Sequence, residues 1–329
     1  MPDLHHMIEE SQRNKKRLQV NASEEKITIK PLDFVVQKSK VLSLFKNVDV
    51  VSDRLKEFAS LCLKNKKAIN QYLQLKNRSD FSITDIVNYM PNILSFENKR
   101  AYFKKEVQRI QRSAQHDEVS LNIRRGQIFM DAYANLNYRK GDIKGKFRIR
   151  FEGEEGIDAG GVARDFYIEL SRQMFNPDYS LFKLCSNGVS HYVAQNSFIN
   201  PDHLTYLAFA GRMIGKALFD GHYMDCYFAK PLYKMILGED LTFGDLEDLD
   251  NEFYRGLKWM IDEDVENASL VFAVDREFFG KYEEIDLIPN GRNIAVTNEN
   301  KLKYIEHRVH FFLYGMVREQ IDAFLTGFH

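Results

Sequence analysis

The sequence predicts an α+β protein that is mostly α-helical. Apolar residues recur at helical spacing over most of the chain beyond residue 32, whereas apolar and charged residues alternate strictly at 147–151. No segment repeats with a period of roughly 20–50 residues, which argues against a solenoid. The 329 residues are enough for two domains or for one large lobe.

The N-terminal part of the chain divides into a tail and a helical region. Residues 1–25 are charged and aperiodic, which predicts a flexible tail. Residues 26–94 are predicted to be helical, with Pro91 near their end. Ser95 is then expected to cap a further helix. The expected buried stripe of that helix is Phe96, Phe103, Val107 and Ile110. We therefore place a domain boundary at about residues 90–95.

Residues 95–329 are predicted to form a mixed domain. The strand at 147–151 precedes a glycine-rich loop, and two more short strands are expected at 269–274 and 294–297. Helices are expected at about 126–136, 161–175, 203–219 and 297–324. The last of these is the longest, and Thr297 or Asn298 is its expected N-cap.

Composition argues against several classes of function. With 46 Lys and Arg against 47 Asp and Glu, the chain has no global field that would attract nucleic acid. No stretch approaches 18 consecutive apolar residues, so no membrane partner is expected. Three scattered cysteines indicate a reducing compartment, and we expect the protein in the cytoplasm. The basic run at 13–17 is either a solvated tail or a nuclear address.

Two segments invite comparison with phosphate-binding loops, and both fail. In 211–217 (GRMIGKA) the spacing is one residue short and no Ser or Thr follows the lysine, so its small residues favour helix–helix packing instead. The loop at 151–161 carries several carboxylates, which would repel a phosphate. His5 and His6 have no partner cluster that would complete a metal site. We therefore expect no nucleotide, cofactor or metal.

Several motifs of the chain together resemble those of one family. Residues 151–166 (FEGEEGIDAGGVARDF) resemble the FEGEEGxDAGGxxREW signature of the HECT-type ubiquitin ligases, with departures at the last two positions. Residues 171–182 and 203–217 follow further family motifs in the same order, and 323–328 (AFLTGF) resemble the segment that closes the N-lobe. The resemblance covers about residues 95–329. The preceding helices are similar to the region upstream of the HECT domain in the very large ligases of the family.

The resemblance implies a bilobed HECT N-lobe, with a large helical subdomain and a small E2-binding subdomain at about 225–300. In the family, an E2 enzyme passes ubiquitin to a cysteine in a C-terminal lobe, and a substrate lysine then attacks the thioester. The catalytic cysteine is expected beyond His329, because none of the three cysteines of this chain has that context; they are Cys62, Cys185 and Cys226. The chain alone is therefore expected to be inactive, with an E2, ubiquitin and protein substrates as partners of the full-length protein.

The resemblance also places candidate E2-binding residues. They are Phe253, Leu257 and Met260, with Tyr304 opposite them. The first three have the i, i+4, i+7 spacing of one helical stripe, which either docks a partner or packs internally.

A ubiquitin exosite known in one branch of the family maps to Asn176, Tyr179 and Phe279. Leu184 and Phe312 depart from that branch, which has a tyrosine and an arginine there. Asp158 and Arg164 are expected to be structural rather than catalytic.

A second function stays open on the sequence: a catalytically inert HECT-like module that binds ubiquitin or other proteins. A cysteine-bearing lobe encoded after His329 would favour the ligase fragment, and a stop codon there would favour the binding module.

Overall fold

The structure is a computed structural model that describes residues 53–75, 86, 90–113, 118–137, 143–154, 160–278 and 281–329. The chain forms two compact units, Met1–Ser113 and Ala114–His329. The division falls after the helix that we expected to open the second domain, so that helix belongs to the N-terminal unit. The predicted tail at 1–25 lies outside the described residues.

The N-terminal unit is helical. Its elements are α2 (Asp53–Lys64), α3 (Lys66–Leu75), the 3₁₀ turn η2 (Pro91–Ile93) and α5 (Phe96–Ser113). The Asn70 amide ties the start of α5 to α3: its Oδ1 accepts from the Ser95 N–H at 2.6 Å and from the Asn98 amide at 2.8 Å, and its Nδ2 donates to the Ile93 carbonyl at 2.9 Å. Because Asn70 is buried, these bonds satisfy groups that would otherwise be costly to bury.

The predicted cap of α5 is confirmed, whereas its predicted buried stripe is wrong. Ser95 Oγ accepts a bond from the Asn98 N–H at 3.4 Å, which confirms the expected cap. Phe96, Phe103 and Ile110, however, are 72%, 44% and 37% exposed. Among the described residues, the small core of this unit is formed by α2, α3 and the segment around η2, and the stripe of α5 contributes no residue to it, although Val107 is half-buried.

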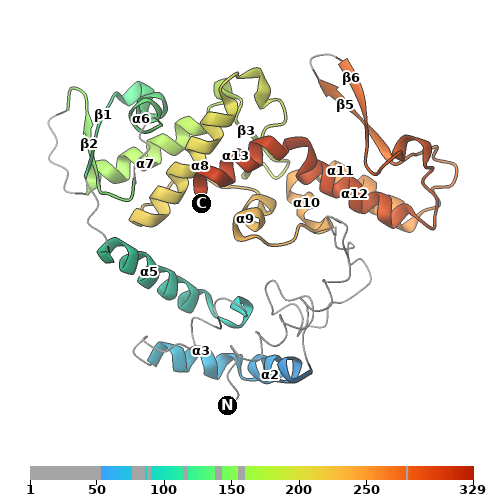
Figure 1. Cartoon of the computed structure of the whole chain (residues 1–329), viewed down its shortest axis with the longest axis horizontal. Helices are drawn as coiled ribbons and strands as arrows, with labels where there is room; N and C mark the ends of the chain where they lie inside the picture. The colour runs from blue at the N-terminus through green and yellow to red at the C-terminus, as the bar shows by residue number, and fades with distance from the viewer. Residues whose placement is uncertain are drawn as a thin grey trace, which may run out of the picture. The chain divides into compact units, whose positions relative to one another are not determined.

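The first half of the C-terminal unit mixes helices with short strands (Figure 1). Its elements are β1 (Val119–Ile123), η3 (Arg125–Gln127), α6 (Ile128–Leu136), β2 (Phe147–Phe151), α7 (Gly161–Met174), η4 (Pro177–Tyr179), β3 (Phe182–Leu184), β4 (His191–Val193), η5 (Ser197–Ile199), α8 (His203–Asp220) and α9 (Lys230–Leu237). Strands β1 and β2 are parallel, and β3 pairs with β4 in antiparallel fashion. Strand β2 buries every second residue, as its alternation predicted.

Helix α8 packs closely against α13 (Arg318–Phe328) (Figure 1). A Cβ on Gly211 would lie 2.0 Å from the Phe324 carbonyl oxygen, and one on Gly215 would lie 2.8 Å from that of Phe328. On α13, a Cβ on Gly327 would lie 1.8 Å from the Ala208 carbonyl oxygen. The small residues of 211–217 therefore let two helix backbones approach, which confirms the packing interpretation of that motif.

The second half of the unit contains what we call the α11–α12 layer, residues 246–313. Its elements are α10 (Leu246–Leu249), α11 (Asn251–Asp262), β5 (Ala273–Phe278), β6 (Lys281–Asp286), η7 (Gly291–Asn293) and α12 (Lys301–Leu313). Strands β5 and β6 form an antiparallel hairpin that extends from the layer (Figure 1). The strand expected at 269–274 is confirmed only at Ala273 and Val274, which begin β5, and the strand expected at 294–297 is reduced to an isolated antiparallel bridge between Val271 and Ala295. The hairpin escaped the sequence analysis because both of its faces carry charged residues.

The long helix expected at 297–324 is also wrong, because it is broken in two. Helix α12 ends at Leu313, the 3₁₀ turn η8 (Gly315–Val317) follows, and α13 begins at Arg318. The buried Tyr192 hydroxyl donates to the Leu313 carbonyl, and the Val317 N–H bonds to the Tyr314 carbonyl instead. The N-cap is Asn300 rather than Thr297 or Asn298. Within the described ranges, no helix is long and apolar enough to cross a membrane. The α+β, mostly helical fold class is confirmed.

Candidate functional site

Helix α11 carries three of the four candidate E2-binding residues. Its N-cap is Asp250, whose Oδ1 accepts from the Phe253 N–H at 3.0 Å. Leu257 and Met260 point into the layer and are buried. The facing Tyr304, from α12, is also buried and packs edge-on against Phe272 at 5.5 Å. The internal-packing alternative thus describes Leu257, Met260 and Tyr304, and their contact with a partner stays a prediction.

Phe253 is the candidate that reaches the surface of the layer. Its ring packs on that of Phe312 with 4.6 Å between centroids, and the Arg308 guanidinium lies 5.1 Å from the Phe253 centroid. The Lys183 ammonium lies 5.8 Å from the Phe312 centroid. A half-buried aromatic pair with a cation on each side joins α11, α12 and β3.

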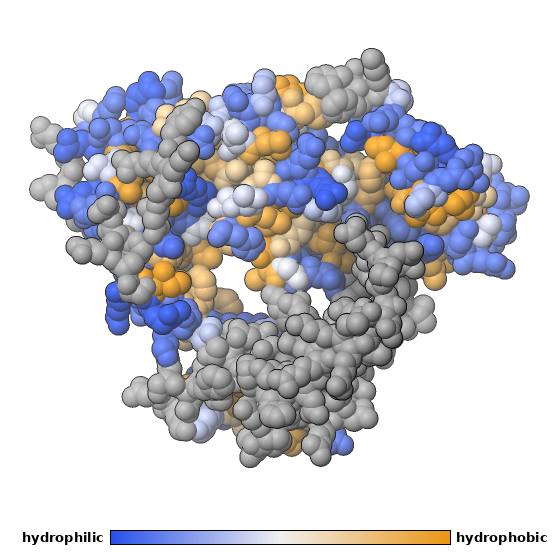
Figure 2. Space-filling model, viewed as in Figure 1, coloured by the Kyte–Doolittle hydropathy of each residue, from blue (hydrophilic) through white to orange (hydrophobic). Residues whose placement is uncertain are grey.

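Trp259 is a surface residue that the sequence analysis did not single out. It is the chain's one tryptophan, it lies on α11, and it is 57% exposed. Its position follows from the helical period, because Leu257 and Met260 face the core and the two residues between them, Lys258 and Trp259, turn outward. Figure 2 shows hydrophobic residues over α11 and α12 among hydrophilic ones. A large exposed aromatic side chain at such a place is typical of a protein-binding surface.

The structure describes two of the three candidate exosite residues, Asn176 and Tyr179. Asn176 is exposed and caps η4, where its Oδ1 accepts from the Asp178 N–H at 3.1 Å. Tyr179, at the end of the same turn, packs its ring 5.0 Å from that of Phe129, and burial raises its pKa. Phe279 lies outside the described residues. The structure therefore brings Asn176 and Tyr179 together on one turn, and a ubiquitin contact there stays a prediction.

Arg125, which the sequence did not mark as a functional candidate, links Glu154 at the start of the glycine-rich loop to Asp165 on α7. Arg125 forms ion pairs with Glu154, at 2.6 Å, and with Asp165, and its guanidinium carbon lies 3.9 Å above the Phe151 ring. The pKa of Glu154 is lowered by its hydrogen bond with Arg125. Asp158 lies outside the described residues, and Arg164 is exposed on α7, so their structural role is not tested.

The pKa of each of the three thiols is raised, which favours the protonated thiol over the thiolate. Cys62 and Cys185 are buried and Cys226 is half-buried, and all three are free. Burial raises the pKa of each thiol, to about 11 for Cys226. Because the thiolate is the nucleophile, these cysteines are poor candidates for covalent chemistry near neutral pH.

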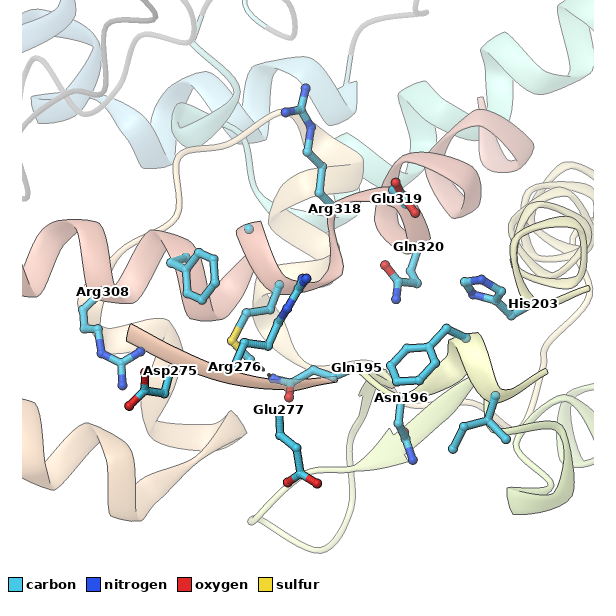
Figure 3. A pocket seen from close by; sticks show the side chains of 15 residues that line it. Gln195, Asn196, His203, Asp275, Arg276, Glu277, Arg308, Arg318, Glu319 and Gln320 are labelled. Carbon is cyan, nitrogen blue, oxygen red and sulfur yellow. Dashed lines mark hydrogen bonds between the residues drawn. The ribbon is translucent and has the colours of Figure 1, made fainter. Parts of the chain in front are cut away.

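A cavity of about 890 Å³ lies where β5, η5, α12, η8 and α13 meet (Figure 3). The charged residues of its wall are Asp275, Arg276, Glu277, Arg308, Arg318 and Glu319. Apolar side chains, among them Phe311 and Met316, complete the wall. Burial lowers the pKa of the lining His203, whose Nδ1 lies 2.9 Å from Ser197 Oγ, so its imidazole is neutral near pH 7.

The family model and the similar proteins name the same class of enzyme. Residues 168–329 match the family model described as HECT-domain (ubiquitin-transferase). The chain is 43% identical over 245 residues to an E3 ubiquitin-protein ligase TOM1-like of Neurospora crassa, covering 73% of this chain and 6% of that protein. It is 37% identical over 288 residues to the E3 ubiquitin-protein ligase ptr1 of Schizosaccharomyces pombe, covering 86% and 9%. It is 36% identical over 271 residues to the E3 ubiquitin-protein ligase HUWE1 of Mus musculus, covering 80% and 6%. The chain thus spans less than a tenth of the length of these relatives.

Proposed function

We propose, from the premise that this chain belongs to the HECT family of ubiquitin transferases, that it is the E2-recruiting lobe of a ubiquitin ligase. The observation that carries the proposal is the family match at 168–329, which includes α8, α13 and the whole α11–α12 layer. The similarity to ligases from three organisms supports it further. In the full-length protein, the E2 delivers ubiquitin to a catalytic cysteine as a thioester, and a substrate lysine then accepts it.

The exposed side of α11 is the part of this lobe best suited to contact the E2. Trp259 is exposed there, whereas the stripe of Leu257 and Met260 is committed to the core. Phe253 is half-buried and held in place by its stacking on Phe312, so it can be contacted without unfolding the layer. Large aromatic side chains contribute much of the binding energy at protein interfaces.

The docking role is tested by titrating the chain with a panel of purified E2 enzymes and measuring binding by calorimetry. We expect saturable binding to one or a few E2s and a loss of about tenfold or more in affinity for Trp259→Ala. Tyr223→Ala is the matched control, because Tyr223 is 78% exposed on the loop after α8. If no E2 binds a folded sample, or if both variants weaken binding equally, the assignment to α11 fails.

A second assay addresses the chain's own chemistry. When an E2 loaded with labelled ubiquitin is mixed with the chain, we expect no ubiquitin thioester on the chain in a non-reducing gel. The raised pKa values of Cys62, Cys185 and Cys226 support this expectation. A reducible ubiquitin adduct at any of these thiols would contradict it. Binding of ubiquitin without binding of any E2 would favour the alternative of an inert binding module.

A further inference from the structure

Strand β5 has an open edge that borders the cavity. In the part of the chain that the structure describes, the sheet containing β5 has β6 as its other strand, so the second edge of β5 is unpaired. Three consecutive residues of β5, from Asp275 to Glu277, line the cavity, which places the strand along its wall (Figure 3). An unpaired edge presents backbone N–H and C=O groups that an additional strand can bond.

The size and the apolar lining of the cavity suit a peptide segment. Its volume of about 890 Å³ lies within the range of roughly 300–1,000 Å³ found for ligand sites. The apolar part of the lining includes Phe311, Met316 and Ile199, and Ile199 is 60% exposed. These side chains can pack against apolar residues of a bound strand.

The charged residues of the lining determine which charge a bound segment should carry. Two of the three arginines are already paired with carboxylates outside the cavity: Arg276 with Glu283 at 3.0 Å and Arg318 with Asp322 at 3.7 Å. Among the described residues, the lining carboxylates form no ion pair; they are Asp275, Glu277 and Glu319. The remaining arginine, Arg308, stacks on Phe253, which does not neutralise its charge, so it offsets one of the three carboxylates. The lining charge that forms no ion pair among the described residues is therefore acidic on balance.

The two carboxylates of β5 lie on the same face of the strand, so the charges alternate along it. In a strand, alternate side chains share a face, so Asp275 and Glu277 lie on one face and Arg276 on the other (Figure 3). A strand added at this edge would place every second side chain beside the two carboxylates. Cross-strand pairs of opposite charge stabilise such an arrangement.

We propose that this cavity binds an extended basic segment of a partner protein, which adds as a strand to the free edge of β5. The segment alternates basic residues, beside Asp275 and Glu277, with apolar residues that face Phe311 and Met316. The cavity adjoins the E2 surface proposed on α11 through Arg308, which stacks on Phe253, but the proposal does not depend on E2 binding.

Fluorescence anisotropy with the full chain tests the proposal. The probe is a labelled, acetylated and amidated peptide in which lysine alternates with valine. We expect saturable binding, and no binding of the matched peptide in which glutamate replaces lysine. The double variant Asp275→Asn, Glu277→Gln should weaken binding by about 3- to 30-fold, as expected for two exposed charge pairs. The control, Glu252→Gln with Asp262→Asn on exposed positions of α11, should leave it unchanged.

Two N-methylated versions of the probe separate strand addition from simple charge attraction. In one version all lysine amides are methylated, and in the other all valine amides. Because alternate N–H groups of a strand point to opposite edges, we expect one version to lose binding and the other to keep it. The proposal is overturned if the parent peptide does not bind, or if both methylated versions bind as the parent does. It is also overturned if the double variant of β5 and the control variant of α11 weaken binding equally.

Discussion

Replacing Gly211 by alanine tests whether the contact between α8 and α13 organises the C-terminal unit. The added Cβ would lie 2.0 Å from the Phe324 carbonyl oxygen and 3.0 Å from the Phe328 nitrogen. Both neighbours are backbone atoms, so no side-chain rotation can relieve the overlap, and the two helices must separate by roughly 1 Å. Overpacking of this kind costs about 1–3 kcal/mol.

An opposing term makes the sign of the result informative. In a helix interior, alanine is favoured over glycine by about 1 kcal/mol, so without the clash Gly211→Ala would be stabilising. With the upper end of the overpacking cost, we expect a net loss of about 2 kcal/mol. In a domain of roughly 150–250 residues this corresponds to a decrease in Tm of about 4–8 °C.

The matched control is Gly256→Ala on α11, where an added Cβ meets nothing within 4 Å. We expect this variant to gain up to about 1 kcal/mol. Urea and thermal unfolding, followed by circular dichroism, measure both free energies. If Gly211→Ala is as stable as the wild type or more stable, the close approach of α8 and α13 is not the constraint that we infer.

Three further predictions concern buried and paired groups. Lys216→Met should lower the free energy of unfolding by about 3 kcal/mol, measured in urea, because it leaves the carboxylate of Asp220 without a buried ammonium 2.5 Å away. The hydrogen bond from Arg124 lowers the pKa of Asp131 in the folded state, so its contribution is present at neutral pH and is lost as the pH falls through that value. Asp131→Asn should therefore reduce the loss of stability between about pH 5 and pH 2 in urea titrations. Burial raises the pKa of Cys226 from 9.0 to about 11, so iodoacetamide at pH 8 should label it about a hundredfold more slowly than a thiol with the unshifted pKa, as peptide mass spectrometry can measure. The first two predictions fail if the variant responds as the wild type does. The third fails if Cys226 is labelled as fast as a thiol with the unshifted pKa.

Local signals were enough to place many of the elements. The alternation at 147–151 predicted β2, and the glycines after α8 and α9, Gly221 and Gly238, adopt the positive φ values of helix ends. The small residues at 211 and 215 predicted helix packing, and the order of the motifs predicted the family, which the comparisons confirm. These features depend on the residue itself or on its near neighbours in sequence.

The sequence by itself determined the fold class, the family and most helix positions, because periodicity and turn residues act locally. Only the tertiary structure decided where α12 ends, because the Leu313 carbonyl is taken by Tyr192, which is distant in sequence. It also decided that Leu257 and Met260 are core residues and that Trp259 is exposed, since one helical stripe fits either a core or a partner. The open edge of β5 is likewise a tertiary feature, because a charged strand has no periodic signal and its pairing depends on β6.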